Sequence, residues 1–134
     1  MQDFYRQHGF VPYFESRPAT VQWCYDFWRE HVRPNKLVVV HLRNNPLEDA
    51  VRNAPLEHWL ELIRQAAGTY DATFVLIGAR EEIDPRFREL PNVLVAGDFG
   101  SSMEQDFVLV QSAQLFLGTP SRPNTMAWYS DTAT

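Results

Sequence analysis

The sequence predicts an α/β fold in which a mainly parallel sheet is covered by helices. With 134 residues the chain has the size of one compact domain. Its composition, 45% hydrophobic and 22% charged, provides enough apolar surface for a core and is close to that of ordinary globular proteins. Short apolar runs of strand length alternate along the chain with segments of helical spacing, and this alternation is typical of α/β domains.

Residues 1–34 form an aromatic-rich segment followed by a helix, which we expect to pack on the domain made by residues 35–134. The helix is predicted over Ala19–Val32 and ends before Pro34. Its apolar side chains recur at helical spacing: Val21, Cys24, Tyr25, Trp28 and Val32.

Four strands are predicted from short apolar runs. The first, Lys36–His41, holds four consecutive apolar residues and does not alternate with polar ones. Such a strand is buried on both faces, as in a parallel sheet with helices on either side. The other runs are Thr73–Ile77, Val93–Ala96 and Leu115–Leu117.

Three further helices are predicted between and after these strands. One begins with Pro55 as its first helical residue and ends at Gly68, with an apolar stripe of Leu56, Trp59, Leu60, Ile63 and Ala67. The next, Ser102–Ala113, is capped by Ser101 or Ser102 and shows Met103, Phe107, Val110 and Ala113 at helical spacing. A last helix starts within Asn124–Ser130. With right-handed crossovers, this order gives a Rossmann-like three-layer domain.

Charge and composition exclude several classes of function. Seventeen acidic residues against 12 basic ones give a net charge of −5, which disfavours nucleic-acid binding. The single cysteine, Cys24, can form no intramolecular disulfide, and no Cys/His pattern predicts a zinc site. The sequence shows neither a signal peptide nor a membrane span, and we expect a cytoplasmic protein.

The candidate site lies where the four strands end, because ligands of open parallel sheets bind at the carboxyl ends of the strands. Four polar or glycine-containing segments follow the predicted strands: HLRNN at 41–45, GAREE at 78–82, GDFG at 97–100 and GTPSRPNT at 118–125. They should meet along one edge of the sheet, although they are far apart in sequence.

The first segment carries the leading candidates for anion binding. His41 and Arg43 are two residues apart, so both leave the same face of an extended backbone, and the forked guanidinium of Arg43 suits a phosphate. The alternative is an ion pair at the strand end with an acidic side chain, for which the sequence offers Glu48, Asp49 and Glu81.

The fourth segment places small and hydroxyl residues at a junction between strand and helix, where backbone N–H groups attract phosphate. These residues are Gly118, Thr119, Ser121 and Thr125. The alternative is an ordinary Ser/Thr helix cap without a ligand. Asp98 is either a turn residue or a contact to a base or sugar. The sequence contains neither G-x-G-x-x-G after the first strand nor a P-loop motif, which disfavours a dinucleotide dehydrogenase or a P-loop enzyme.

Taken together, the segments VVVHLRNN, TFVLIGAREE, LPNVLVAGD and QDFVLVQSAQLFLGTPSRPNTMAW resemble the nucleotide-sugar-binding half of GT-B glycosyltransferases, most of all the fucosyltransferase-like group. The resemblance spans roughly residues 36–130. It implies a nucleotide-diphosphate sugar, GDP- or UDP-linked, as the ligand. Together with the positions of the segments at the strand ends, it predicts substrate-binding roles for His41, Arg43, Gly78, Asp98, Gly118, Thr119, Ser121 and Thr125. Arg43 would contact the pyrophosphate, whereas residues 92–98 would lie near the base.

The resemblance has two departures with consequences for activity. Asn44 and Asn45 follow the His-x-Arg motif, where the group often has a further Arg or an Asp. GT-B enzymes also form their active site between two domains, and one domain is expected here. We therefore name no catalytic residue and expect a partner domain or a second copy. Because no Asp-x-Asp pair occurs, neither a metal nor another cofactor is expected. The alternatives are a non-catalytic interaction module and a flavodoxin-like binding protein.

Overall fold

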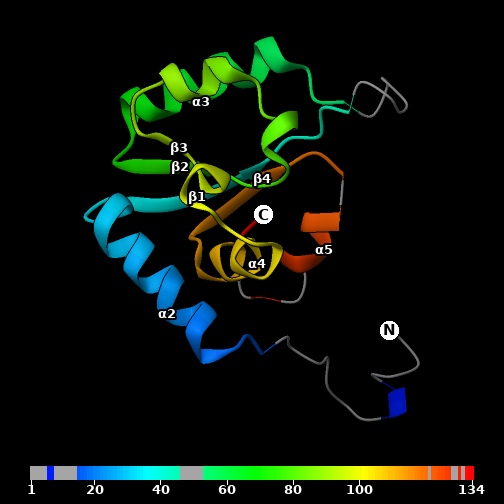
Figure 1. Cartoon of the computed structure of the whole chain (residues 1–134). Helices are drawn as coiled ribbons and strands as arrows, with labels where there is room; N and C mark the ends of the chain where they lie inside the picture. Colours follow the sequence, from blue (N-terminus) through cyan, green and yellow to red (C-terminus); the bar gives the residue numbers. More distant parts are fainter. Residues whose placement is uncertain (1–5, 8–14, 46–52, 121, 128–129, 131) are drawn as a thin grey trace.

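A computed structural model describes residues 6–7, 15–45, 53–120, 122–127, 130 and 132–134 of the chain. It confirms the predicted α/β class with a parallel sheet between layers of helices (Figure 1). Within the described residues, no helix combines the length and the apolar character that crossing a membrane requires.

The sheet contains four strands in the order β3-β2-β1-β4, and all neighbouring strands run parallel. Each predicted strand is present, with ends shifted by one residue in three of them. The bounds are β1 Lys36–His41, β2 Ala72–Leu76, β3 Val93–Val95 and β4 Leu115–Gly118. The strand β1 is central, as its unbroken apolar run predicted.

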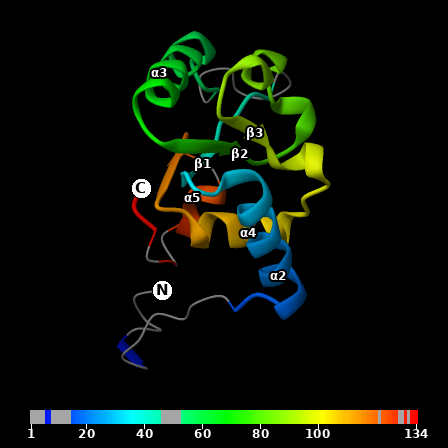
Figure 2. The same ribbon diagram turned by 90° about the vertical axis from the view of Figure 1, so that its left-hand side faces the viewer.

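Helices cover both faces of the sheet, with α3 on one side and α2 and α4 on the other (Figure 2). Side chains of β1 alternate between these two layers: Val38 and Val40 pack toward α3, and Leu37 and Val39 toward α2 and α4. The helix bounds are α2 Pro18–Phe27, α3 Leu56–Thr69, α4 Met103–Ser112 and α5 Arg122–Ala127. A π-helical turn, η1 Trp28–Val32, continues α2.

The N-terminal helix buries only part of the predicted stripe. Cys24 and Val32 are buried and Trp28 packs against the core, as predicted, but Val21 and Tyr25 are about half exposed. Thr20 and Phe27, which lie outside the predicted stripe, are buried. The apolar residues of this segment are so numerous that more than one helical stripe can be drawn through them. Which stripe is buried depends on where α4 lies, and the local spacing does not contain that information.

The predicted apolar stripe of α3 is fully buried from Leu60 onward but only partly buried in the first turn of the helix. Leu60, Ile63 and Ala67 are buried, while Leu56 and Trp59 pack at the edge of the core and remain partly exposed. The helix begins one residue later than predicted, so that Pro55 precedes its first turn.

The helix α4 is capped by Ser102, one of the two predicted caps. Its hydroxyl accepts a hydrogen bond from the backbone N–H of Gln105, and the Gln105 side chain accepts one from the backbone N–H of Ser102. The predicted position of Met103 on the core face is wrong, since this side chain is 73% exposed. Val108 and Leu109 are buried instead, together with the expected Val110.

Candidate functional site

The strand order creates a topological switch point beside β1. From β1 the chain passes through α3 to β2 and then to β3 on one side, and α4 returns it to β4 on the other side. A crevice forms at the carboxyl ends of two strands whose connections leave in opposite directions, and ligands of open α/β sheets bind there. In this chain the switch point lies between the carboxyl ends of β1 and β4.

Hydrogen bonds at this switch point join the first and fourth candidate segments. His41 of β1 is in register with Gly118 of β4, and the Thr119 N–H donates to the His41 carbonyl at 3.2 Å. The Arg43 N–H donates to the Thr119 Oγ1 at 3.0 Å. Four of the predicted site residues, far apart in sequence, are therefore neighbours in the fold.

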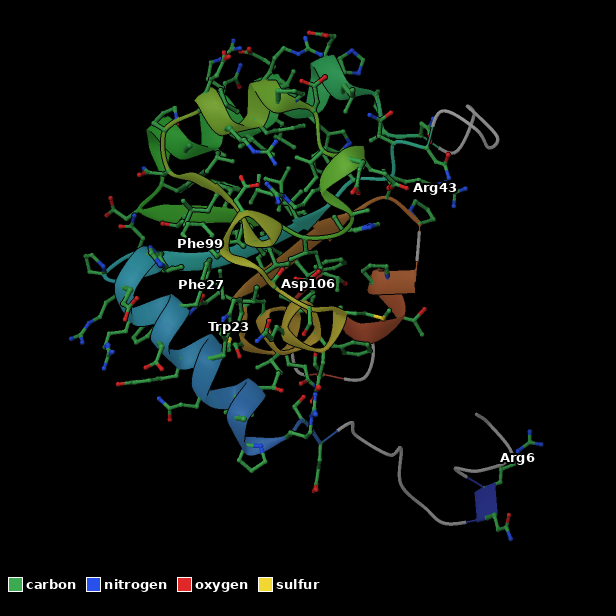
Figure 3. All side chains as sticks on the ribbon, viewed as in Figure 1. Arg6, Trp23, Phe27, Arg43, Phe99 and Asp106 are labelled. Carbon is green, nitrogen blue, oxygen red and sulfur yellow. The ribbon has the colours of Figure 1, made fainter. Side chains whose placement is uncertain are left out.

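Arg43 continues from β1 to the edge of the sheet, where Figure 3 shows it beside the turn that follows β4. Its Nε is buried, so part of the guanidinium is held within the edge. Of the acidic residues named as alternative partners, Glu48 and Asp49 lie outside the described residues. Glu81 is exposed and takes part in no ion pair within the described part of the chain.

Gly78 fits tightly between β2 and the His41 ring. Its φ is +111°, and a Cβ at this position would lie 3.1 Å from the His41 Cδ2 and 3.2 Å from its Nε2. The site therefore needs glycine for two reasons, the backbone conformation and the space. Burial lowers the pKa of the His41 imidazole, which favours its neutral form.

Asp106, in the first turn of α4, is a site residue that the sequence analysis missed. Its Oδ2 accepts a hydrogen bond from the Gly78 N–H at 3.3 Å. Its Oδ1 is buried and has no hydrogen-bond partner among the described residues. Burial raises the pKa of this carboxyl, and hydrogen bonds from Ser101 and Gly78 oppose that effect. An acidic residue in a first helical turn is common, so no pattern in the sequence pointed to this contact.

Asp98 lies at the ends of β2 and β3, in the short helix η5 Ala96–Phe99. Its carboxylate binds two arginines: the Arg88 Nε at 2.6 Å and the Arg80 Nη2 at 3.1 Å. The hydrogen bond from Arg88 is the main cause that lowers the pKa of Asp98. The stem of Arg80 lies against Gly97, where a Cβ would come within 2.5 Å of its Cγ. The carboxylate of Asp98 is therefore already paired with two arginine side chains of the same chain, Arg80 and Arg88.

The structure does not join the last two predicted site residues, Ser121 and Thr125, to the others. Ser121 lies outside the described residues, and Thr125 is exposed on α5. Among the described side chains, no three histidines, cysteines or carboxylates come close enough to hold a metal ion. The residues that the structure brings together are His41, Arg43, Gly78, Asp106, Gly118 and Thr119.

Comparison with known proteins identifies a similar fold. No protein-family model and no curated protein sequence matches the chain. Among solved structures, the chain is similar to E. coli heptosyltransferase WaaC with ADP-2-deoxy-2-fluoro heptose, with a TM-score of 0.59 and 21% sequence identity. The match covers 96% of this chain and 40% of the heptosyltransferase chain. At this identity the similarity shows a shared fold.

Proposed function

We propose that the chain is a glycosyltransferase-like domain that binds the diphosphate of a nucleotide-sugar donor at the carboxyl edge of its sheet. The observation that carries this proposal is the hydrogen bond between the Arg43 N–H and Thr119 Oγ1 at the switch point. This bond supports the proposal because it joins the backbone of Arg43, the residue that carries the guanidinium, to the hydroxyl-bearing turn at the carboxyl ends of β1 and β4, and open α/β sheets bind phosphates at such strand ends.

The charge distribution supports Arg43 as the main anion-binding residue. A chain with a net charge of −5 must gather local positive charge to hold a diphosphate. Arg80, the next arginine along this edge, shares its guanidinium with Asp98 and is 63% exposed. Ordering an exposed side chain on binding costs entropy, whereas Arg43 already has a buried Nε at the end of a strand.

The chemistry that such a site supports is the departure of a nucleoside diphosphate. In glycosyl transfer the bond between the sugar C1 and the diphosphate oxygen breaks, and the bonding electron pair leaves with the diphosphate. A guanidinium fixed beside that oxygen stabilises the negative charge that develops there. The base that deprotonates the acceptor would come from outside this edge, and we assign it to no residue of this chain.

The structural comparison supports the same class of ligand. The matched protein is a heptosyltransferase seen with an ADP-linked sugar, and its fold agrees with the GT-B resemblance of the sequence. The chain spans 40% of that protein, so transfer activity would require a partner domain. The resemblance of the sequence to the fucosyltransferase-like group favours a GDP- or UDP-linked sugar, whereas the structurally similar heptosyltransferase was seen with an ADP-linked one. All three nucleotides therefore belong in the test.

The test is calorimetric titration of the chain with ADP, GDP and UDP, and with the corresponding nucleosides. Charge-assisted hydrogen bonds contribute about 1.5–3 kcal/mol, so Arg43→Ala should weaken diphosphate binding by about 10- to 100-fold. Arg43→Lys should restore part of the affinity, because an ammonium cannot make a two-pronged contact. Arg64→Ala is the matched control, since Arg64 is exposed on α3 and paired with Glu61.

Two results would contradict the proposal. One is equal affinity of the wild type and both Arg43 variants, and the other is no binding of any nucleoside diphosphate by a folded chain. The second result would favour the alternative, a non-catalytic interaction module of the same fold. Turnover after addition of a separately produced partner domain would distinguish a split enzyme from a binding protein.

A further inference from the structure

A cavity of about 540 Å³ opens between α3 and the sheet, well separated from the proposed ligand edge. Its lining is apolar and comes from α3 and from strands β1, β2 and β4; it includes Val38, Leu62, Ile63, Ala66, Leu115 and Leu117. Lys36, Ala72 and Leu115, the first residues of β1, β2 and β4, border it. The cavity therefore lies toward the amino ends of the strands, whereas Arg43 and Thr119 lie at the carboxyl ends. We call it the amino-end groove.

Among the described residues, one face of the sheet is incompletely covered at the amino-end groove. The two faces of β4 differ in burial: Phe116, toward α4, is 2% exposed, but Leu115 and Leu117, toward α3, are only partly buried. Strands of a parallel sheet are normally covered on both faces. Beside the groove, Leu62 is 49% and Tyr70 66% exposed. Large apolar side chains around an open apolar cavity are typical of an interaction surface.

Two opposite charges lie together at the rim of this groove. The Lys36 N–H donates to the Asp71 carbonyl at 2.9 Å, so the two residues are neighbours across the ends of β1 and β2. Both side chains are exposed, and neither enters an ion pair among the described residues. If a two-fold axis passes between Lys36 and Asp71, Lys36 of one copy comes to lie opposite Asp71 of the second copy, and Asp71 opposite Lys36. The rim is therefore complementary in charge to itself.

We propose that the amino-end groove is the contact surface of a symmetric homodimer. In this dimer Leu62 and Tyr70 of each copy fill the groove of the other, and Lys36 of each copy pairs with Asp71 of the other. The second copy thereby covers the α3 face of β4, which the described part of the chain leaves partly exposed. This inference goes beyond the proposed function and does not depend on it, because dimerisation through the amino ends leaves the carboxyl edge of both copies open.

The test combines oligomeric state with a charge exchange. Sedimentation velocity of the wild-type chain over a concentration series should show a reversible dimer. Lys36→Glu and Asp71→Lys should each raise the dimer dissociation constant by at least about tenfold, because each places like charges across the axis. An equimolar mixture of the two variants should recover the wild-type dissociation constant as a heterodimer, since both cross-axis pairs are again opposite in charge.

Two further variants complete the design. Leu62→Glu should dissociate the dimer by placing a charge in the groove. Glu89→Lys should leave the dissociation constant unchanged, because Glu89 is an exposed residue of the short helix η4 Pro85–Glu89, beside β3 at the opposite edge of the sheet. Circular dichroism and thermal melting establish that every variant is folded.

The outcomes are decisive in both directions. A dimer that the single charge reversals weaken and the mixture restores supports the proposal. It is overturned by a wild-type chain that stays monomeric at all concentrations, by a dimer that Leu62→Glu does not affect, or by a mixture that fails to restore association. Nucleotide titration is measured separately, so a negative result there does not bear on the dimer.

Discussion

Replacing Gly78 by alanine tests the tightest contact of the candidate site. The substitution forces a Cβ onto a residue with φ +111° and brings it 3.1 Å from the His41 ring. A side chain in such a backbone conformation costs about 1–3 kcal/mol. The contact adds an overpacking cost of about 1–3 kcal/mol, because the ring must shift by a few tenths of an ångström. Gly78→Ala should therefore lower the free energy of unfolding by about 2–6 kcal/mol.

Two other glycines separate these effects. Gly100 has φ +74° but open space around it, so Gly100→Ala should cost only the backbone strain, about 1–2 kcal/mol. Gly68 lies within α3 with nothing near its Cβ position, and Gly68→Ala should stabilise the chain by up to about 1 kcal/mol through helix propensity. Replacing glycine by alanine is thus expected to lower the free energy of unfolding at Gly78 and Gly100 and to raise it at Gly68.

Urea unfolding followed by circular dichroism measures all three variants. If Gly78→Ala costs no more than Gly100→Ala, the close approach of His41 to Gly78 contributes nothing and our account of this corner of the site is wrong. A gain in stability at Gly78 would contradict the backbone assignment itself.

Two further predictions concern the core and pH. Ile63→Ala should lower the free energy of unfolding by about 2–5 kcal/mol, because Ile63 is fully buried. Trp59→Ala should lower it by less, because Trp59 lies at the edge of the core. A larger loss for Trp59→Ala in denaturant unfolding would contradict our assignment of the buried face of α3. Burial lowers the pKa of His41 in the folded state below the ordinary histidine value, near 6.5. The neutral His41 side chain therefore contributes stability at pH values above the ordinary pKa, and this contribution is lost as the pH falls through the folded-state pKa. The stability difference between wild type and His41→Gln should therefore shrink between pH 8 and pH 5, and a constant difference would show that His41 titrates alike in the folded and unfolded chains.

The elements of the fold could be predicted from the sequence because buried parallel strands leave an unmistakable pattern. The run Leu37 to Val40 identified β1 as a central strand. The prediction that the ends of β1 and β4 share one edge of the sheet followed from the parallel arrangement, and the register of His41 with Gly118 agrees with it. Faces of helices were harder to predict. In α2, apolar residues lie all around the helix, and the position of α4 decides that Phe27 is buried and Tyr25 is not.

The candidate site was predicted where it depends on strand ends and missed where it depends on a helix from elsewhere. His41, Arg43 and Thr119 follow strands and could be placed on one edge in advance. The contact of Asp106 with Gly78 spans 28 residues and arises because α4 starts beneath the end of β2. Asp98 was considered a turn residue or a ligand contact, and its two ion pairs depend on Arg80 and Arg88 reaching it from neighbouring segments.

The switch point between β1 and β4 also bears on how the chain folds. Its two sides are 76 residues apart at the hydrogen bond from Arg43 to Thr119, and α4 must cross the sheet before β4 can dock. Contacts of such long range close late, because the entropy of the intervening loop is lost before they form. A ligand held by both strands would bind only the fully folded chain and slow its global opening. Amide hydrogen exchange of β1 and β4 should then become slower together, far beyond the residues that touch the ligand.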